Sequence, residues 1–270
     1  MEYVQSAWKI RIPKAEIVDG AAIHHIGAVL SLPPKYYRER ILKIGFIGKN
    51  TRLLDAGCGA GHWSIVASFL NQEVKGVDST AKYLDYAFRL NRQFRRKNLE
   101  FRLAKIEKLP FKNAYFDYVI CYDAWMYTNK EKTLQEFQRV LKPRGKLYLA
   151  DVAGLGWYLN LIWQAVREGN RGLLLIALKA IKSQIHTYPK DTVANLKKYH
   201  FNILGFGPDG SLGDAKIQIH PTLPAKKFGF WNAYEVLAEK IIVRQYPSKD
   251  TDLDFPSEKI RSKRSARSSR

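Results

Sequence analysis

The stretch LLDAGCGAGHWS at residues 53–64 places three glycines between two different hydrophobic periodicities. TRLLDAG is a short apolar run typical of a buried strand, and HWSIVASFLNQ is typical of a helix. Gly57, Gly59 and Gly61 let the backbone approach a ligand closely, and the helix that follows offers free N–H groups at its start. We therefore expect a strand–turn–helix unit that holds a ligand at the end of a sheet.

Strand and helix patterns alternate from residue 51 to about residue 150, the order expected of βαβ units around a parallel sheet. The fold class expected is α/β, with helices predicted over TAKYLDYAFRLNRQFRRKN and EKTLQEFQRVLK, the second of which Pro143 would end. The further strands expected are VKGVD, LEFRLA, FDYVICYD, GKLYLAD, ILGFGPDGSLG and YEVLAEKIIV.

The chain divides into three segments by composition. Residues 1–50 are expected to form an N-terminal cap segment, in which KYYRERILK is a loop leading into a helix over the ligand-binding edge. Residues 51–246 form the main domain, including an apolar helical and loop insert at 155–230 that shapes a pocket. Residues 247–270 are poor in apolar residues, which predicts a disordered basic tail.

The net charge and the hydropathy pattern restrict the classes of possible partner but do not identify one. The formal net charge is +20, and the last twelve residues, KIRSKRSARSSR, hold six positive charges and no acid. Such a chain can be drawn toward nucleic acid, anionic lipid or acidic small molecules. GLGWYLNLIWQAV and GLLLIALKAI are too short to span a membrane, so no transmembrane helix is predicted, although their apolar faces leave contact with a membrane surface open.

The cysteines and histidines do not predict a disulfide scaffold or a metal site. The chain has only two cysteines, Cys58 and Cys121, and no apolar signal sequence at its start, which favours a reducing cytoplasm. His24 and His25 are adjacent and would point in different directions, so they cannot both hold one ion. We expect no metal.

The glycine turn fits neither of two common phosphate-binding patterns. A P-loop needs the sequence Gly-Lys-Ser/Thr to begin where His62 stands, and a dinucleotide fingerprint needs its third glycine at that same position. Instead the turn reads GxGxG with Asp55 two residues before it, and Asp78 closes the next predicted strand. Two carboxylates at this edge suit a ligand that carries a positive charge and ribose hydroxyls.

These features resemble the class I S-adenosylmethionine-dependent methyltransferases, specifically the group with small-molecule acceptors. The resemblance covers about residues 50–151, through LLDAGCGAG, VKGVDST, EKLPFKNAYFDYVIC and EFQRVLKPRGKLYLAD in the family's order. It implies a Rossmann-like sheet, mostly parallel with an antiparallel edge strand and helices on both faces, capped by the N-terminal segment and by residues 155–230. It also implies S-adenosyl-L-methionine as the cofactor.

The resemblance assigns roles by position. Asp55 and the glycine turn, Cys58 included, would hold the methionine part, and Asp78 with Ser79 would meet the ribose. The backbone N–H of Ile106 would read the adenine, because Lys105 stands where the family commonly has an acid. Cys121 and Tyr122 would border the sulfonium. The cofactor-binding residues expected are Asp55, Gly57, Cys58, Gly59, Gly61, Asp78, Ser79, Ile106, Cys121 and Tyr122.

Asp123, one step past a strand end, is the candidate general base for a protic acceptor; the alternative is a helix-capping or purely structural acid in the loop CYDAWMYTNK. The function expected is methyl transfer to a small molecule. The alternative is an RNA or other nucleic-acid methyltransferase, but CYDAWMY lacks the Asn/Asp-Pro-Pro-aromatic turn of many base aminomethylases. A third hypothesis, a non-catalytic cofactor-binding scaffold, is disfavoured by the intact Asp55, glycine turn and Asp78.

Overall fold

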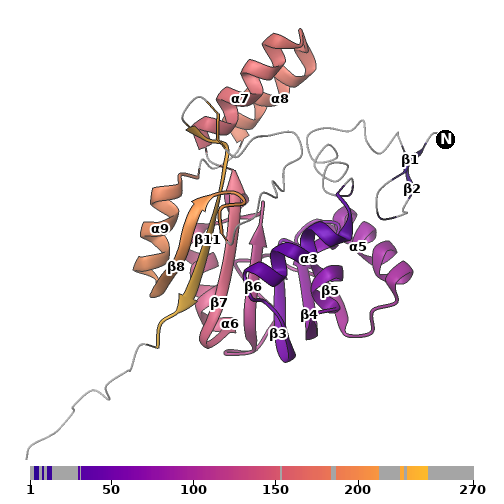
Figure 1. The fold of residues 1–270 in the computed structure, drawn as a ribbon, viewed down its shortest axis with the longest axis vertical. Coiled ribbons are helices and arrows are strands. Elements are labelled where there is room, and N and C mark those ends of the chain that lie inside the picture. The colour runs from indigo at the N-terminus through magenta and orange to yellow at the C-terminus, as the bar shows by residue number, and fades with distance from the viewer. Residues whose placement is uncertain are drawn as a thin grey trace, which may run out of the picture.

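A seven-stranded sheet forms the centre of the molecule in this computed structural model (Figure 1). The structure describes residues 3–5, 8, 11–13, 30, 32–152, 154–183, 187–212, 226–227 and 230–242. The strand order is β5-β4-β3-β6-β7-β11-β8. These strands are β3 (Gly48–Ala56), β4 (Asn71–Asp78), β5 (Leu99–Leu103), β6 (Phe116–Tyr122), β7 (Leu141–Val152), β8 (Phe201–Pro208) and β11 (Ala233–Lys240).

The sheet is mostly parallel, as the sequence predicts. β3 pairs in parallel with β4 and β6, and the parallel pairing continues outward to β5 and β7. β11 runs antiparallel to both β7 and β8, so the antiparallel strand lies one place in from the edge. Two small ladders complete the strands, β1 (Tyr3–Gln5) with β2 (Arg11–Pro13) and β9 (Lys226–Lys227) with β10 (Phe230–Trp231).

Helices cover both faces of the sheet, which buries apolar residues on both sides of the central strands. On one face Tyr37, Trp63 and Leu90 pack in a core beneath α3, α4 and α5. On the other face Trp125 and Phe137 pack in a second core beneath a 3₁₀ turn, α6 and α9. The helical elements of these layers are α3 (Pro34–Lys43), α4 (His62–Ser68), α5 (Ala81–Phe94), η1 (Trp125–Tyr127), α6 (Lys130–Val140) and α9 (Pro189–Lys198).

α7 (Gly154–Arg167) and α8 (Arg171–Ser183) form a helical hairpin that stands apart from these layers. Figure 1 shows the hairpin beyond the end of β7, on the side of the sheet to which the parallel strands point. Within the described ranges, no helix is both long enough and apolar enough to cross a membrane.

Three predicted boundaries are wrong for local reasons. The helix predicted over HWSIVASFLNQ ends at Ser68, because the Asn71 amide donates to the Phe46 and Ala67 carbonyls and starts β4. The helix before Pro143 already ends at Val140, where β7 takes over the backbone. KYYRERILK is helical throughout and not partly a loop, because Pro34 supplies the backbone geometry that favours a first helical turn.

The structure describes much of the predicted insert at 155–230 but little of residues 1–31 and none of the tail at 247–270. α9 and β8 fall inside the 155–230 insert, yet β8 is a strand of the central sheet and α9 packs on it. The part of the insert that projects beyond the sheet within the described residues is therefore the α7–α8 hairpin. The basic tail at 247–270 and most of residues 1–31 lie outside the described residues.

Candidate cofactor and acceptor sites

The glycine turn lies between the end of β3 and the start of α4. Gly57, Gly59 and Gly61 all have positive φ, at 80°, 51° and 78°. The N–H groups of Gly57 and Cys58 both donate to the Val77 carbonyl at 2.8 Å, which fastens the turn to the end of β4. The predicted strand–turn–helix unit is present, and its turn is held against the neighbouring strand.

Two of these glycines meet different surroundings. A Cβ on Gly57 would lie 2.3 Å from the Ala124 Cβ, so the backbone there packs directly against the loop after β6. A Cβ on Gly59 would meet nothing within 4 Å. Gly59 therefore marks the open side of the turn, where a ligand could approach the backbone.

Asp78 closes β4 beside that open side. One carboxylate oxygen accepts from the Gly59 N–H at 2.9 Å, and the other accepts from the Thr80 N–H at 2.8 Å. Burial raises the pKa of Asp78, although these backbone hydrogen bonds act in the opposite direction. Each oxygen can accept a further hydrogen bond, so the carboxylate can hold the turn and still receive two hydroxyls.

Asp55 lies under the turn. It is buried, and its carboxylate accepts from the Ser64 hydroxyl at 2.6 Å. Burial raises its pKa to about 7, with a smaller contribution from the charge of Asp78. In this arrangement Asp55 joins β3 to α4, and its contact with the methionine part of a cofactor stays a prediction.

The remaining predicted cofactor residues surround the turn at different depths. Ile106 is buried, and its Cδ1 atom lies 3.4 Å from the position of a Cβ on Gly57. Ser79 is exposed beside Asp78. On β6, Tyr122 packs 5.2 Å from the Trp63 ring, whereas Cys121 lies in the core on the opposite face.

The two thiols are structural. The side chains of Cys58 and Cys121 are both buried, and burial raises the pKa of each well above its usual value. A raised pKa keeps a thiol protonated and unreactive. The backbone of Cys121, and not its side chain, is the part that could border a ligand.

Asp123 follows β6 in a left-handed backbone conformation with φ of 51°, and its N–H donates to the Ala150 carbonyl at 2.9 Å. Burial raises its pKa well above the usual range, and the charges of Asp151 and Asp209 add to the shift. The pKa of the predicted base is therefore raised by two further carboxylates, Asp151 near the end of β7 and Asp209 directly after β8.

Sequence reasoning missed Asp151, the last acid of the predicted strand GKLYLAD. It is buried at the end of β7, where the Val152 N–H donates to one oxygen at 2.8 Å. Burial raises the pKa of Asp151. Burial also lowers the pKa of nearby Lys130, whose ammonium lies over the Trp125 ring. The available signal was that Asp151 closes its strand just as Asp55 and Asp78 close theirs.

A buried ionic network joins α3 to the far side of the sheet. The Arg40 guanidinium donates to Asp209 at 2.6 Å and to Glu235 at 2.5 Å. Glu235 also accepts from the Tyr148 hydroxyl at 2.7 Å and from the Leu212 N–H at 2.6 Å. No sequence pattern pointed to this network, because its members are far apart along the chain.

No group of His, Cys, Asp and Glu side chains in the described part of the chain is arranged to hold a metal ion. A sequence model described as a methyltransferase domain matches residues 47–198, more than half of the chain. The protein belongs to the class I S-adenosylmethionine-dependent methyltransferase family. Family membership confirms the resemblance seen in the glycine turn and the strand ends, and S-adenosylmethionine is the cofactor of that family.

Two curated relatives show how far the likeness extends. The methyltransferase is 36% identical over 101 residues to the uncharacterized methyltransferase YcgJ of Bacillus subtilis, covering 37% of this chain and 40% of the relative. It is 29% identical over 168 residues to malonyl-[acyl-carrier protein] O-methyltransferase of Serratia marcescens, covering 60% and 63%. In both comparisons the chain spans less than two thirds of the relative's length.

A solved structure agrees with the fold. Geranyl diphosphate methyltransferase in complex with SAM superposes with a TM-score of 0.61 at 14% identity, covering 85% of this methyltransferase and 96% of that chain. At this identity the likeness concerns the fold alone. It supports the Rossmann-like α/β assignment.

Proposed function

We propose that this protein transfers a methyl group from S-adenosylmethionine to a small-molecule acceptor. The observation that carries the proposal is the hydrogen bond from the Gly59 N–H to Asp78, which sets a carboxylate beside the open side of the glycine turn. A buried carboxylate that can accept further hydrogen bonds suits the hydroxyls of a ribose. The neighbouring glycine backbone, which has no side chain, lets the methionine part of the ligand pass close to the turn.

The cofactor would be held mainly by groups that already have fixed positions. Asp78, with Ser79 beside it, would receive the ribose hydroxyls, and the backbone of the glycine turn would pass under the methionine part. The Ile106 N–H would meet the adenine, while Tyr122 and the Cys121 backbone would border the sulfonium. When bound, S-adenosylmethionine supplies an activated methyl group, so the protein's task is to orient the acceptor and exclude water.

Asp123 is the proposed proton acceptor for an acceptor that carries a proton on oxygen or nitrogen. A base is most effective when its pKa lies near the working pH, and burial beside Asp151 and Asp209 raises the pKa of Asp123 in that direction. A carboxylate or thiolate acceptor would not need this step.

The small-molecule class of acceptor rests on the sequence relatives. The Serratia relative is named for methyl transfer to an oxygen of malonyl-[acyl-carrier protein]. The two buried free thiols are compatible with a reducing compartment, and we place the protein in the cytoplasm as part of the same proposal.

A nucleic-acid acceptor is the second candidate, because one surface favours it. A groove of about 600 Å³ on the outer side of α5 carries four cationic side chains and an exposed aromatic ring. Polyanions bind such surfaces with affinity that falls steeply with salt. The groove is lined by Asp85, Phe88, Asn91, Arg92, Arg95, Arg96 and Lys97.

The deciding experiment incubates the full chain with S-adenosylmethionine carrying a labelled methyl group and either a small-metabolite extract or mixed RNA and DNA. We expect label in the small-molecule fraction. For an acceptor that carries a proton on oxygen or nitrogen, Asp123→Asn should abolish that transfer while leaving calorimetric binding of S-adenosylmethionine unchanged. Label in the polymer would replace the small-molecule proposal with the nucleic-acid one, and absence of cofactor binding would overturn both.

A further inference from the structure

The α7–α8 hairpin is apolar on two different faces. Its inner face is buried and comprises Tyr158, Leu161 and Ala165 on α7 and Ala177 on α8, and the two helices contact each other. The α7 residues recur at spacings of three and four, as expected for one side of a helix. This inner face accounts for the packing of the hairpin.

The outer face is apolar as well and stays exposed. Leu159, Trp163 and Val166 recur on α7 at spacings of four and three, a stripe more than a third of a turn away from the inner one. Leu175 and Leu178 lie three apart on α8. Val166 is 70% exposed, Leu175 59% and Leu178 46%, so these side chains gain little from packing within the chain.

The charged residues in the sequence of the hairpin are mostly of one sign. Between residues 154 and 183 the sequence has four basic residues, Arg167, Arg171, Lys179 and Lys182, and a single acid, Glu168. Arg167 and Arg171 are exposed where the two helices are joined, and the Arg167 guanidinium lies over the Trp163 ring at 5.2 Å. An apolar stripe with a tryptophan and flanking cations complements the interface of an anionic bilayer.

We propose that the outer face of the hairpin, formed by Leu159, Trp163, Val166, Leu175 and Leu178, docks onto a lipid bilayer that contains anionic lipid. Neither helix is long enough to cross the bilayer, so the hairpin lies in the interface with its apolar side chains inserted. Figure 1 shows the hairpin beyond the carboxyl ends of the parallel strands, the edge that also carries the glycine turn.

The test is co-sedimentation of the full-length protein with vesicles of phosphatidylcholine alone or mixed with phosphatidylglycerol. The double variant Val166→Glu and Leu178→Glu places two carboxylates on the outer face. The matched control is Leu204→Glu, because Leu204 is 45% exposed on β8 and Leu178 is 46% exposed on the hairpin. The basic C-terminal segment is present in every variant, so a difference between variants reports on the hairpin.

We expect the wild-type chain and Leu204→Glu to bind the mixed vesicles equally, and the double variant to bind at least about tenfold more weakly. Arg167→Glu with Arg171→Glu should reduce binding to the mixed vesicles, with little effect on the neutral ones. Retained circular-dichroism melting of each variant confirms that it folds.

Equal binding by the double variant and the wild type would overturn the proposal. So would a wild-type dimer, detected by analytical ultracentrifugation, that the double variant dissociates, because the outer face would then be covered by a second copy of this chain. Absence of wild-type binding to the mixed vesicles would also reject it. None of these results would alter the proposed methyl transfer, which is measured separately.

Discussion

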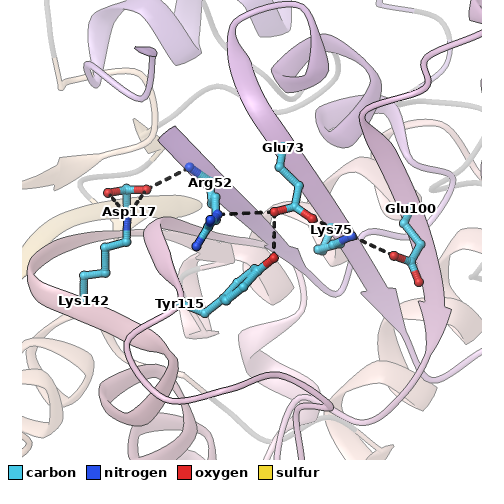
Figure 2. Close-up of polar contacts among 7 residues, drawn as sticks. All are labelled: Arg52, Glu73, Lys75, Glu100, Tyr115, Asp117 and Lys142. Carbon is cyan, nitrogen blue, oxygen red and sulfur yellow. Dashed lines mark hydrogen bonds and ion pairs between the residues drawn. The ribbon is translucent and has the colours of Figure 1, made fainter. Parts of the chain in front are cut away.

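The charged residues at the two ends of the parallel strands have different kinds of partner. At the amino ends, Figure 2 shows Glu73 between Arg52, Lys75 and the Tyr115 hydroxyl. Lys75 continues to Glu100 at 2.7 Å, and Lys142 pairs with Asp117. At the carboxyl ends, Asp55, Asp78 and Asp151 are bonded to hydroxyl or backbone N–H groups.

This difference appears in the pKa values. Hydrogen bonds from Arg102 and Lys75 lower the pKa of Glu100 to about 2, so that carboxylate stays charged. Burial raises the pKa of Asp55 to about 7 and raises that of Asp78 as well. One end of the sheet contains half-exposed, well-paired ions, and the other contains buried acids whose charge is costly. Such perturbed acids cluster where ligands bind.

The largest expected effect comes from Arg40, which is 1% exposed and is the cation bonded to Asp209 and Glu235 near the carboxyl ends. Arg40→Met leaves two buried carboxylates without that cation, so the free energy of unfolding should fall by about 3–5 kcal/mol. Chemical denaturation measures the change. Arg52→Met removes a half-exposed pair at the amino ends and should cost no more than about 1 kcal/mol; equal losses would contradict the distinction.

The second expected effect is on the pH dependence of stability, to which acids at the two ends of the strands contribute with opposite sign. The pKa of Asp55 rises from 3.8 to about 7 on folding, so the folded chain keeps a proton that the unfolded chain loses. Ionisation of Asp55 therefore lowers stability as pH rises through that window. The free energy of unfolding of Asp55→Asn, relative to that of the wild type, should increase by a few kcal/mol as the pH rises from about 4 to 7. Denaturation across pH measures the change.

Glu100→Gln is the control for this sign. The pKa of Glu100 is lowered from 4.5 to about 2, so its stabilising contribution is present above pH 4.5 and is lost as pH falls toward 2. The variant should therefore differ from the wild type most at neutral pH and least in acid. If the stability difference from the wild type changed with pH in the same direction for the Asp55 and Glu100 variants, the two ends would not differ in this respect.

A third prediction separates the two ends of a single strand, β4. Asp78→Ala should weaken binding of S-adenosylmethionine by about 1.5–3 kcal/mol, because hydrogen bonds to a charged group are lost. Titration calorimetry measures the affinity. Glu73→Gln, at the amino end of the same strand, should leave it unchanged. Unaltered affinity in a folded Asp78→Ala protein would remove Asp78 from the site.

The smallest expected effect compares two glycines on either side of β3. Gly45 and Gly59 both have positive φ, at 73° and 51°, and a Cβ on either would meet nothing within 4 Å. Replacing either with alanine should cost about 1 kcal/mol of stability through backbone strain. Only Gly59→Ala should also weaken cofactor binding in calorimetry, and an equal loss of affinity in Gly45→Ala would contradict the position of the site.

Much of the fold and the cofactor side of the site could be predicted because their signals are local. The glycine turn and the strand-closing acids Asp55 and Asp78 lie within 24 residues of one another. The resemblance set the roles of these residues, and the structure brings Gly59 and Asp78 into hydrogen-bond contact. Helix ends were predicted less well, because Asn71 ends α4 through the distant Phe46 carbonyl.

The sequence by itself determined the βαβ order, the glycine turn and the family, because hydrophobic periodicity and turn chemistry depend on residues close together in the chain. Only the tertiary structure decided which acids are buried, that Arg40 reaches Asp209 and Glu235, and that the hairpin keeps an apolar face exposed. Burial and pairing depend on which distant segments meet, and a pKa follows from that environment and not from the residue type.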